Sequence, residues 1–136
     1  MRNYSEYEIF HSKELEHLKK AQELIQLIPD EFMASDWKLR CHEVVRAVGV
    51  QLGLQVVDGL YGCVDHSWLL TGFRGPRSNI LDVYAVGRLP QVQLIDMWYV
   101  GPRHDSLYKP KDDRTDIDCA VVEQLLQFFG TKHFGI

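Results

Sequence analysis

Residues 39–86 read LRCHEVVRAVGVQLGLQVVDGLYGCVDHSWLLTGFRGPRSNILDVYAV, and the spacing of the apolar residues changes once within this stretch. Up to Gly53 they recur at three- and four-residue steps, which predicts a helix over about 39–52 that ends at this glycine. After Gly53 short apolar runs alternate with turn residues, which predicts strands joined by short links. A helix followed by such strands indicates an α+β fold with an antiparallel sheet.

The pattern predicts four strands and two further helices. The strands are Leu54–Gly62, His66–Phe73, Asn79–Val86 and Val92–Trp98. An amphipathic helix is expected from Ser12, as N-cap, to Ile28, where Pro29 ends the pattern. The polar stretch Gly101–Arg114 is interpreted as a loop, and Thr115 is expected to cap a last helix that runs to Phe129.

Composition indicates one globular domain in residues 1–136, with 46% hydrophobic and 25% charged residues. We expect a helical extension over 1–35, a core over 36–100, and a loop and helix over 101–136. A net charge of −4 without a basic cluster argues against nucleic acid as a partner. The chain has no apolar run long enough for a membrane span and no secretory signal pattern at its N-terminus, so we expect a cytoplasmic protein.

Three residues could carry covalent chemistry. Cys41 is expected near the start of the first core helix, where the helix dipole favours a thiolate. His66 opens the second strand on the face that also carries Trp68, and it would reach the thiol if this face packs on the helix. Asp82 lies inside an apolar strand, where an acid needs a partner, and His66 is the neighbouring candidate.

The order of these residues resembles a known superfamily. Cys41 on a helix, His66-Ser67-Trp68 on a strand and Ile80-Leu81-Asp82 on the next resemble the transglutaminase-like core, whose Cys-His-Asp order arylamine N-acetyltransferases share. The resemblance covers roughly residues 37–87. It implies a papain-like fold in which the nucleophile helix packs on a four-stranded antiparallel sheet, with Cys41 as nucleophile, His66 as base and Asp82 as orienting acid.

The sequence departs from this superfamily at three positions. Val83 stands where proline commonly follows the aspartate, His42 replaces an aromatic residue after the cysteine, and Arg40 replaces a glycine before it. These changes concern the acyl pocket and the oxyanion hole more than the triad. Trp37 is the upstream side chain we nominate for the oxyanion hole, and Trp68 for the substrate pocket.

The resemblance implies a small cysteine hydrolase or acyltransferase that acts on an amide, isopeptide or related acyl bond without a cofactor. Its acyl donor would be a protein or a small molecule, and a second protein or a second copy of the chain could complete the cleft.

Two other interpretations stay open. A cysteine on an apolar helix face is often only a buried core residue, so the chain could be a non-catalytic interaction domain that uses the aromatic pair Trp98-Tyr99. Alternatively, Cys41, His42, Cys63 and His66 are residue types that bind zinc. Because adjacent residues on a helix project about 100° apart, Cys41 and His42 are poorly placed to bind one ion, and we expect no metal.

Overall fold

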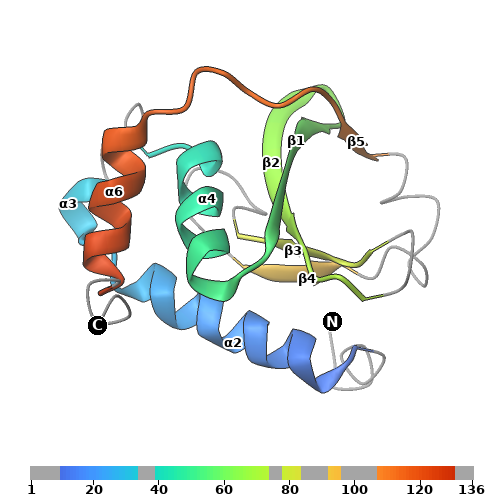
Figure 1. Cartoon of the computed structure of the whole chain (residues 1–136), viewed down its shortest axis with the longest axis horizontal. Helices are drawn as coiled ribbons and strands as arrows, with labels where there is room; N and C mark the ends of the chain where they lie inside the picture. Colours follow the sequence, from blue (N-terminus) through green and yellow to red (C-terminus); the bar gives the residue numbers. More distant parts are fainter. Residues whose placement is uncertain (1–9, 34–38, 74–77, 84–91, 96–106, 131–136) are drawn as a thin grey trace.

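The computed structural model describes residues 10–33, 39–73, 78–83, 92–95 and 107–130 (Figure 1). The helices of this part of the chain are α2 (Ser12–Gln26), α3 (Asp30–Met33), α4 (Cys41–Leu52) and α6 (Cys119–Phe128). The strands are β1 (Gln55–Tyr61), β2 (Val64–Leu70), β3 (Ile80–Asp82), β4 (Gln93–Ile95) and β5 (Tyr108–Pro110). The predicted α+β class is confirmed.

The strands form one antiparallel sheet in the order β4-β3-β2-β1-β5. The predicted meander is present as β1 to β4, but the prediction of four strands is wrong because β5 pairs with the other side of β1. β5 lies in the stretch predicted to be a loop. Three residues are too few for a visible alternation, and Pro110, which lacks an N–H donor, is tolerated only because this strand is at the edge of the sheet.

Both flanking helices begin at other residues than predicted. The N-cap of α2 is His11, whose Nδ1 accepts from the backbone N–H of Lys13, while Glu14 accepts from the backbone N–H of His11. The N-cap of α6 is Asp118, whose carboxylate accepts from the N–H groups of Ala120 and Val121. A carboxylate can satisfy two free N–H groups of a first turn, which explains why the helix starts after Asp118 and not at Thr115.

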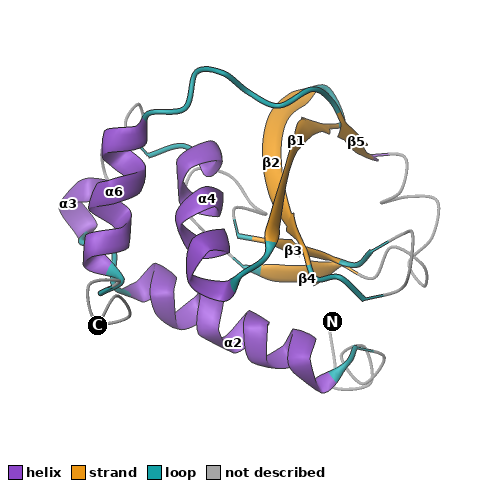
Figure 2. Ribbon diagram, in the orientation of Figure 1, coloured by secondary structure: helices purple, strands orange, loops and turns teal. Residues whose placement is uncertain are grey.

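The helices gather on one side of the sheet (Figure 2). α4 lies between α6 and the sheet, and α2 runs along one end of both (Figure 1). The main core fills the space between the helices and one face of the sheet, with Val44, Val45 and Val48 of α4 packed with Leu69 and Leu81. A second cluster, Trp68, Ile80, Ile95 and Tyr108, lies on the opposite face. Among the residues described, no helix combines the length and the apolar character that crossing a bilayer requires.

Candidate active site

Cys41 is the first residue of α4. The preceding residue, Arg40, has extended backbone angles and its side chain makes no capping hydrogen bond to the helix. The first N–H groups of a helix have no partner inside it. They form the positive end of the helix dipole, which stabilises a negative charge nearby. The Cys41 side chain is only partly buried, so a thiolate at this position is stabilised and remains reachable.

His66 and Asp82 form a buried pair on neighbouring strands. His66 Nε2 lies 2.8 Å from Asp82 Oδ2, and the Tyr108 hydroxyl donates a second hydrogen bond of 2.7 Å to the same oxygen. Burial raises the pKa of Tyr108, and the adjacent charge of Asp82 raises it further, so the phenol remains a donor. Since Asp82 engages Nε2 of His66, Nδ1 is the ring nitrogen left for the thiol.

The Cys41 thiol interacts with two imidazoles, those of His42 and His66. Burial, the largest single influence, raises the thiol pKa, but the two imidazoles outweigh it and bring the pKa to about 7. Burial likewise lowers the pKa of His66, and the contacts with Asp82 and Cys41 overcome this effect and raise it to about 10. At neutral pH the arrangement therefore favours a thiolate beside an imidazolium, with Asp82 behind the imidazolium.

The route by which His66 meets the thiol differs from the expected one. The sequence delivers His66 to the thiol only if the His66 face of the sheet packs on the nucleophile helix, whereas Gly49 of α4 lies against Leu69 and Val56, on the other face. The pairing of β2 with β3 leaves a path for the interaction between His66 and the thiol. It joins Leu69 to Leu81 and Leu70 to Ile80, so the end of β2 that carries His66 extends beyond the paired residues and can meet the start of α4.

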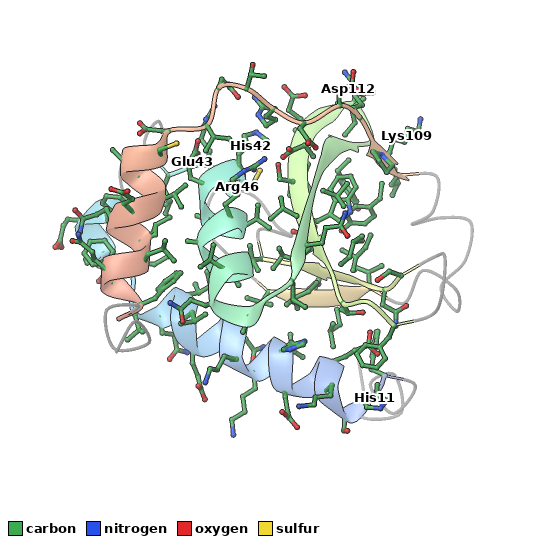
Figure 3. The ribbon with its side chains drawn as sticks, in the orientation of Figure 1. His11, His42, Glu43, Arg46, Lys109 and Asp112 are labelled. Atoms are coloured by element: carbon green, nitrogen blue, oxygen red, sulfur yellow. The ribbon has the colours of Figure 1, made fainter. Side chains whose placement is uncertain are left out.

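A second polar chain, which the sequence did not reveal, begins at His42. Its Nδ1 lies 3.6 Å from Cys41 Sγ and 2.7 Å from Ser67 Oγ. Ser67 donates a 2.6 Å hydrogen bond to Asp58 Oδ1. Asp58 Oδ2 in turn accepts from the Arg46 guanidinium at 2.6 Å and from the backbone N–H of Arg114 at 3.1 Å. Figure 3 shows His42 and Arg46 on the side of α4 that faces β1 and β2.

The segment 111–118, which joins β5 to α6, passes over the start of α4 (Figure 1). The Arg40 guanidinium binds the buried carboxylate of Glu43 and also reaches Asp116 of this segment at 3.2 Å. Glu43 accepts in addition from the backbone N–H of Asp118 at 3.0 Å. These contacts attach the segment to the first turn of α4, beside Cys41.

The remaining predicted residues are less informative. Trp37 lies outside the described residues. Trp68 is 1% exposed and packs edge-on against Tyr108, with 5.0 Å between the ring centroids, so it supports the His66 face from within the second cluster and does not line an open pocket. Within the described ranges, no group of three His, Cys, Asp or Glu side chains is arranged to hold a metal ion. Cys63 and Cys119 are exposed free thiols.

Comparison of the chain with family models, with curated proteins and with solved structures gives no match.

Proposed function

We propose that this chain is a small cysteine hydrolase or acyltransferase with a papain-like, transglutaminase-like core. Cys41 is the nucleophile, His66 the general base and acid, and Asp82 the group that orients His66. The observation that carries the proposal is the interaction of one partly exposed thiol at a helix start with an imidazole whose other nitrogen is held by a buried carboxylate.

The chemistry follows from these contacts. The Cys41 thiolate attacks the carbonyl carbon of an amide, isopeptide or thioester, so that a C–S bond forms and the carbonyl oxygen becomes an oxyanion. The N–H groups of the first turn of α4, which have no partner inside the helix, would donate to that oxyanion. When the oxyanion collapses, the bond to the leaving group breaks and the His66 imidazolium gives its proton to the departing atom. Water or an amine then attacks the thioester, and His66 accepts a proton from this second nucleophile.

Labelling of Cys41 as a function of pH tests the activated thiol. In a Cys63→Ser, Cys119→Ser background, the rate of alkylation by iodoacetamide should rise through about pH 7, where the lowered pKa of the thiol lies, and not near the ordinary value of about 8.5. His66→Ala should slow the labelling at pH 6 by roughly tenfold or more, because one pKa unit is a factor of ten in thiolate. His17→Ala, on α2, is the matched control and should leave the rate unchanged.

Acyl transfer is tested separately. The protein is incubated with a peptide amide, a glutamine side-chain amide and an alkyl thioester, and intact mass spectrometry detects acylated Cys41. An adduct that is absent in Cys41→Ser supports the proposal. A thiol that labels like free cysteine and is indifferent to His66→Ala, with no adduct from any donor, would instead assign the chain to the non-catalytic interaction domains.

A further inference from the structure

Two imidazoles interact with one thiol, and a single nucleophile needs only one base. The proposed triad gives His42 no role. Its side chain is only 5% exposed and lies beside Cys41 Sγ. It is also the first member of a hydrogen-bonded chain that ends at the Arg46 guanidinium and the backbone N–H of Arg114. Burying this many polar groups is costly unless each has a partner. The role of His42 follows from where the protons of this chain lie.

The direction of the hydrogen bonds can be assigned from Asp58 upward. Burial raises the pKa of Asp58, but hydrogen bonds from Arg46, Ser67 and the backbone of Arg114 outweigh it and leave the pKa lowered, so Asp58 is a carboxylate that can only accept. The Ser67 hydroxyl has a single proton, and this proton is donated to Asp58. Ser67 Oγ must therefore accept from His42, which requires a proton on Nδ1 of His42.

We infer that His42 is a second catalytic residue. Its single Nδ1–H is donated to Ser67 Oγ at 2.7 Å and shared with Cys41 Sγ at 3.6 Å, so that it stabilises the thiolate but cannot take its proton. Ser67 and Asp58 are the positioning residues that hold this proton on Nδ1. The inference rests on the proposed function of Cys41 as a nucleophile. It divides the work of the two imidazoles: Asp82 holds Nε2 of His66 and leaves its Nδ1 to exchange a proton with the thiol, whereas Ser67 keeps the proton of His42 on Nδ1.

The same donor is placed to act again during the reaction. His42 Nδ1 lies 3.6 Å from Sγ. Once the C–S bond has formed, its proton is therefore also close to the acyl group that the sulfur carries. No proton is transferred by His42 in either step. The proton that leaves the thiol goes to His66 and returns to the leaving group.

The wild-type protein offers the first test. With ¹⁵N-labelled histidine, long-range ¹H–¹⁵N spectra at pH 7 should show a proton on Nδ1 of His42, and Ser67→Ala should reduce the share of rings that carry it. A neutral His42 protonated on Nε2 alone would overturn the inference, and this measurement does not depend on the folding of any variant.

The second test separates the donor from the ring. In the Cys63→Ser, Cys119→Ser background, His42→Leu should slow alkylation of Cys41 at pH 6 by about tenfold, one pKa unit of the thiol. His42→Asn, whose amide N–H lies near the position of Nδ1–H, should label within about threefold of the parent, since one pKa unit would be a factor of ten. The other charged and titratable groups around the thiol and its imidazoles are the same in all three proteins: His66, Asp82, Tyr108, Tyr61, Asp58, Arg46 and Arg114.

The outcomes distinguish the inference from the proposed function. If acyl donors load Cys41 and both His42 variants label like the parent, the inference fails and the proposed function stands. If His42→Leu slows labelling but no donor loads Cys41, His42 stabilises the thiolate and the proposed function fails. Equal slowing in His42→Leu and His42→Asn, with folded far-UV spectra, would assign His42 a packing role and overturn the inference.

Discussion

At the scale of single residues, Asp82 is the member of the site whose surroundings make the sharpest prediction. Its Oδ2 accepts from both His66 and Tyr108, so the negative charge is shared between an imidazole and a phenol. Removing the charge of Asp82 and removing the hydroxyl of Tyr108 should therefore shift the pKa of the Cys41 thiol in opposite directions. The pair of variants tests whether Asp82 acts through His66.

Asp82→Asn should lower the pKa of His66, which stands at about 10, and weaken its stabilisation of the thiolate. We expect alkylation of Cys41 at pH 6 to slow by about tenfold, which corresponds to a thiol pKa higher by one unit. Tyr108→Phe keeps the ring that packs on Trp68 but removes the competing donor, so His66 has the carboxylate to itself and labelling should be at least as fast as in the wild type. Slower labelling in Tyr108→Phe would contradict the competition between Tyr108 and His66 for the Asp82 carboxylate.

The rate of acylation should show a bell-shaped dependence on pH. The ascending limb reports formation of the thiolate near pH 7, the pKa of Cys41, and the descending limb reports loss of the imidazolium proton near pH 10, the pKa of His66. Because the two groups interact, both limbs belong to the pair. A single ascending limb near pH 9 would contradict an ion pair between Cys41 and His66.

Sequence reasoning found the residues whose signals are local. Cys41 was recognised by its place at a helix start, and Asp82 because strands rarely carry an acid. The same signal applied to Asp58, in the strand Gln55–Tyr61, and would have pointed to a partner for it. His42 has no periodic signal, since its role depends on Ser67, 25 positions later in the chain. Contacts of that range cannot be read from spacing alone.

At the scale of elements, Gly59 fixes how closely β5 approaches β1. A Cβ at this position would lie 2.2 Å from the carbonyl oxygen of Lys109, which is backbone and cannot move without displacing β5. The edge strand was missed by sequence analysis for a related reason. Its place in the sheet depends on a glycine in another strand, about 50 residues earlier, and on no feature of its own three residues.

Gly59→Ala should therefore detach β5 and lower the free energy of unfolding by about 1–3 kcal/mol, as overpacking does. Urea denaturation measures this change, and hydrogen exchange of the Lys111 N–H, which is bonded to Asp58 O, should accelerate. Gly53→Ala is the matched control. An L-residue at its φ of 69° costs about 1 kcal/mol of stability. No atom lies within 4 Å of the new methyl group, so the Lys111 N–H should exchange as in the wild type. Equal exchange in both variants would contradict the steric argument.

At the scale of the whole molecule, the first turn of α4 connects most of the structure. Successive helical residues are rotated by about 100°, so Cys41, His42 and Glu43 point in different directions, and Arg40 precedes them as the extended N-cap residue. Arg40 reaches Asp116 in the segment 111–118, Cys41 meets His66, His42 binds Ser67 in β2, and Glu43 accepts from Asp118 at the start of α6. Figure 3 shows Glu43 on the α6 side of this turn and His42 on the sheet side. Stability and site geometry therefore share the same four residues.

This arrangement predicts that acid destabilises the protein through Glu43 and Asp58. Burial raises the pKa of each carboxyl, but hydrogen bonds, chiefly from Arg40 and Arg46 respectively, outweigh burial, and both pKa values lie below their ordinary values of 4.5 and 3.8. The unfolded chain then binds more protons than the folded one in acid. The stabilisation is fully present above the ordinary values and is lost as the pH falls through the lowered ones.

Glu43→Gln isolates one of these contributions. The variant should lose about 1–3 kcal/mol at pH 7, less than a fully buried pair because the Arg40 side chain is 34% exposed. Its unfolding free energy, measured in urea from pH 7 to pH 3, should also fall less steeply below about pH 4.5 than that of the wild type, because one carboxyl with a lowered pKa has been removed. Glu23→Gln, on the exposed side of α2, is the control and should keep the wild-type slope. If Glu43→Gln and Glu23→Gln fall equally steeply in acid, the connection between Glu43 and Arg40 does not stabilise the fold, and the position of Cys41 must depend on the packing of α4 in the core.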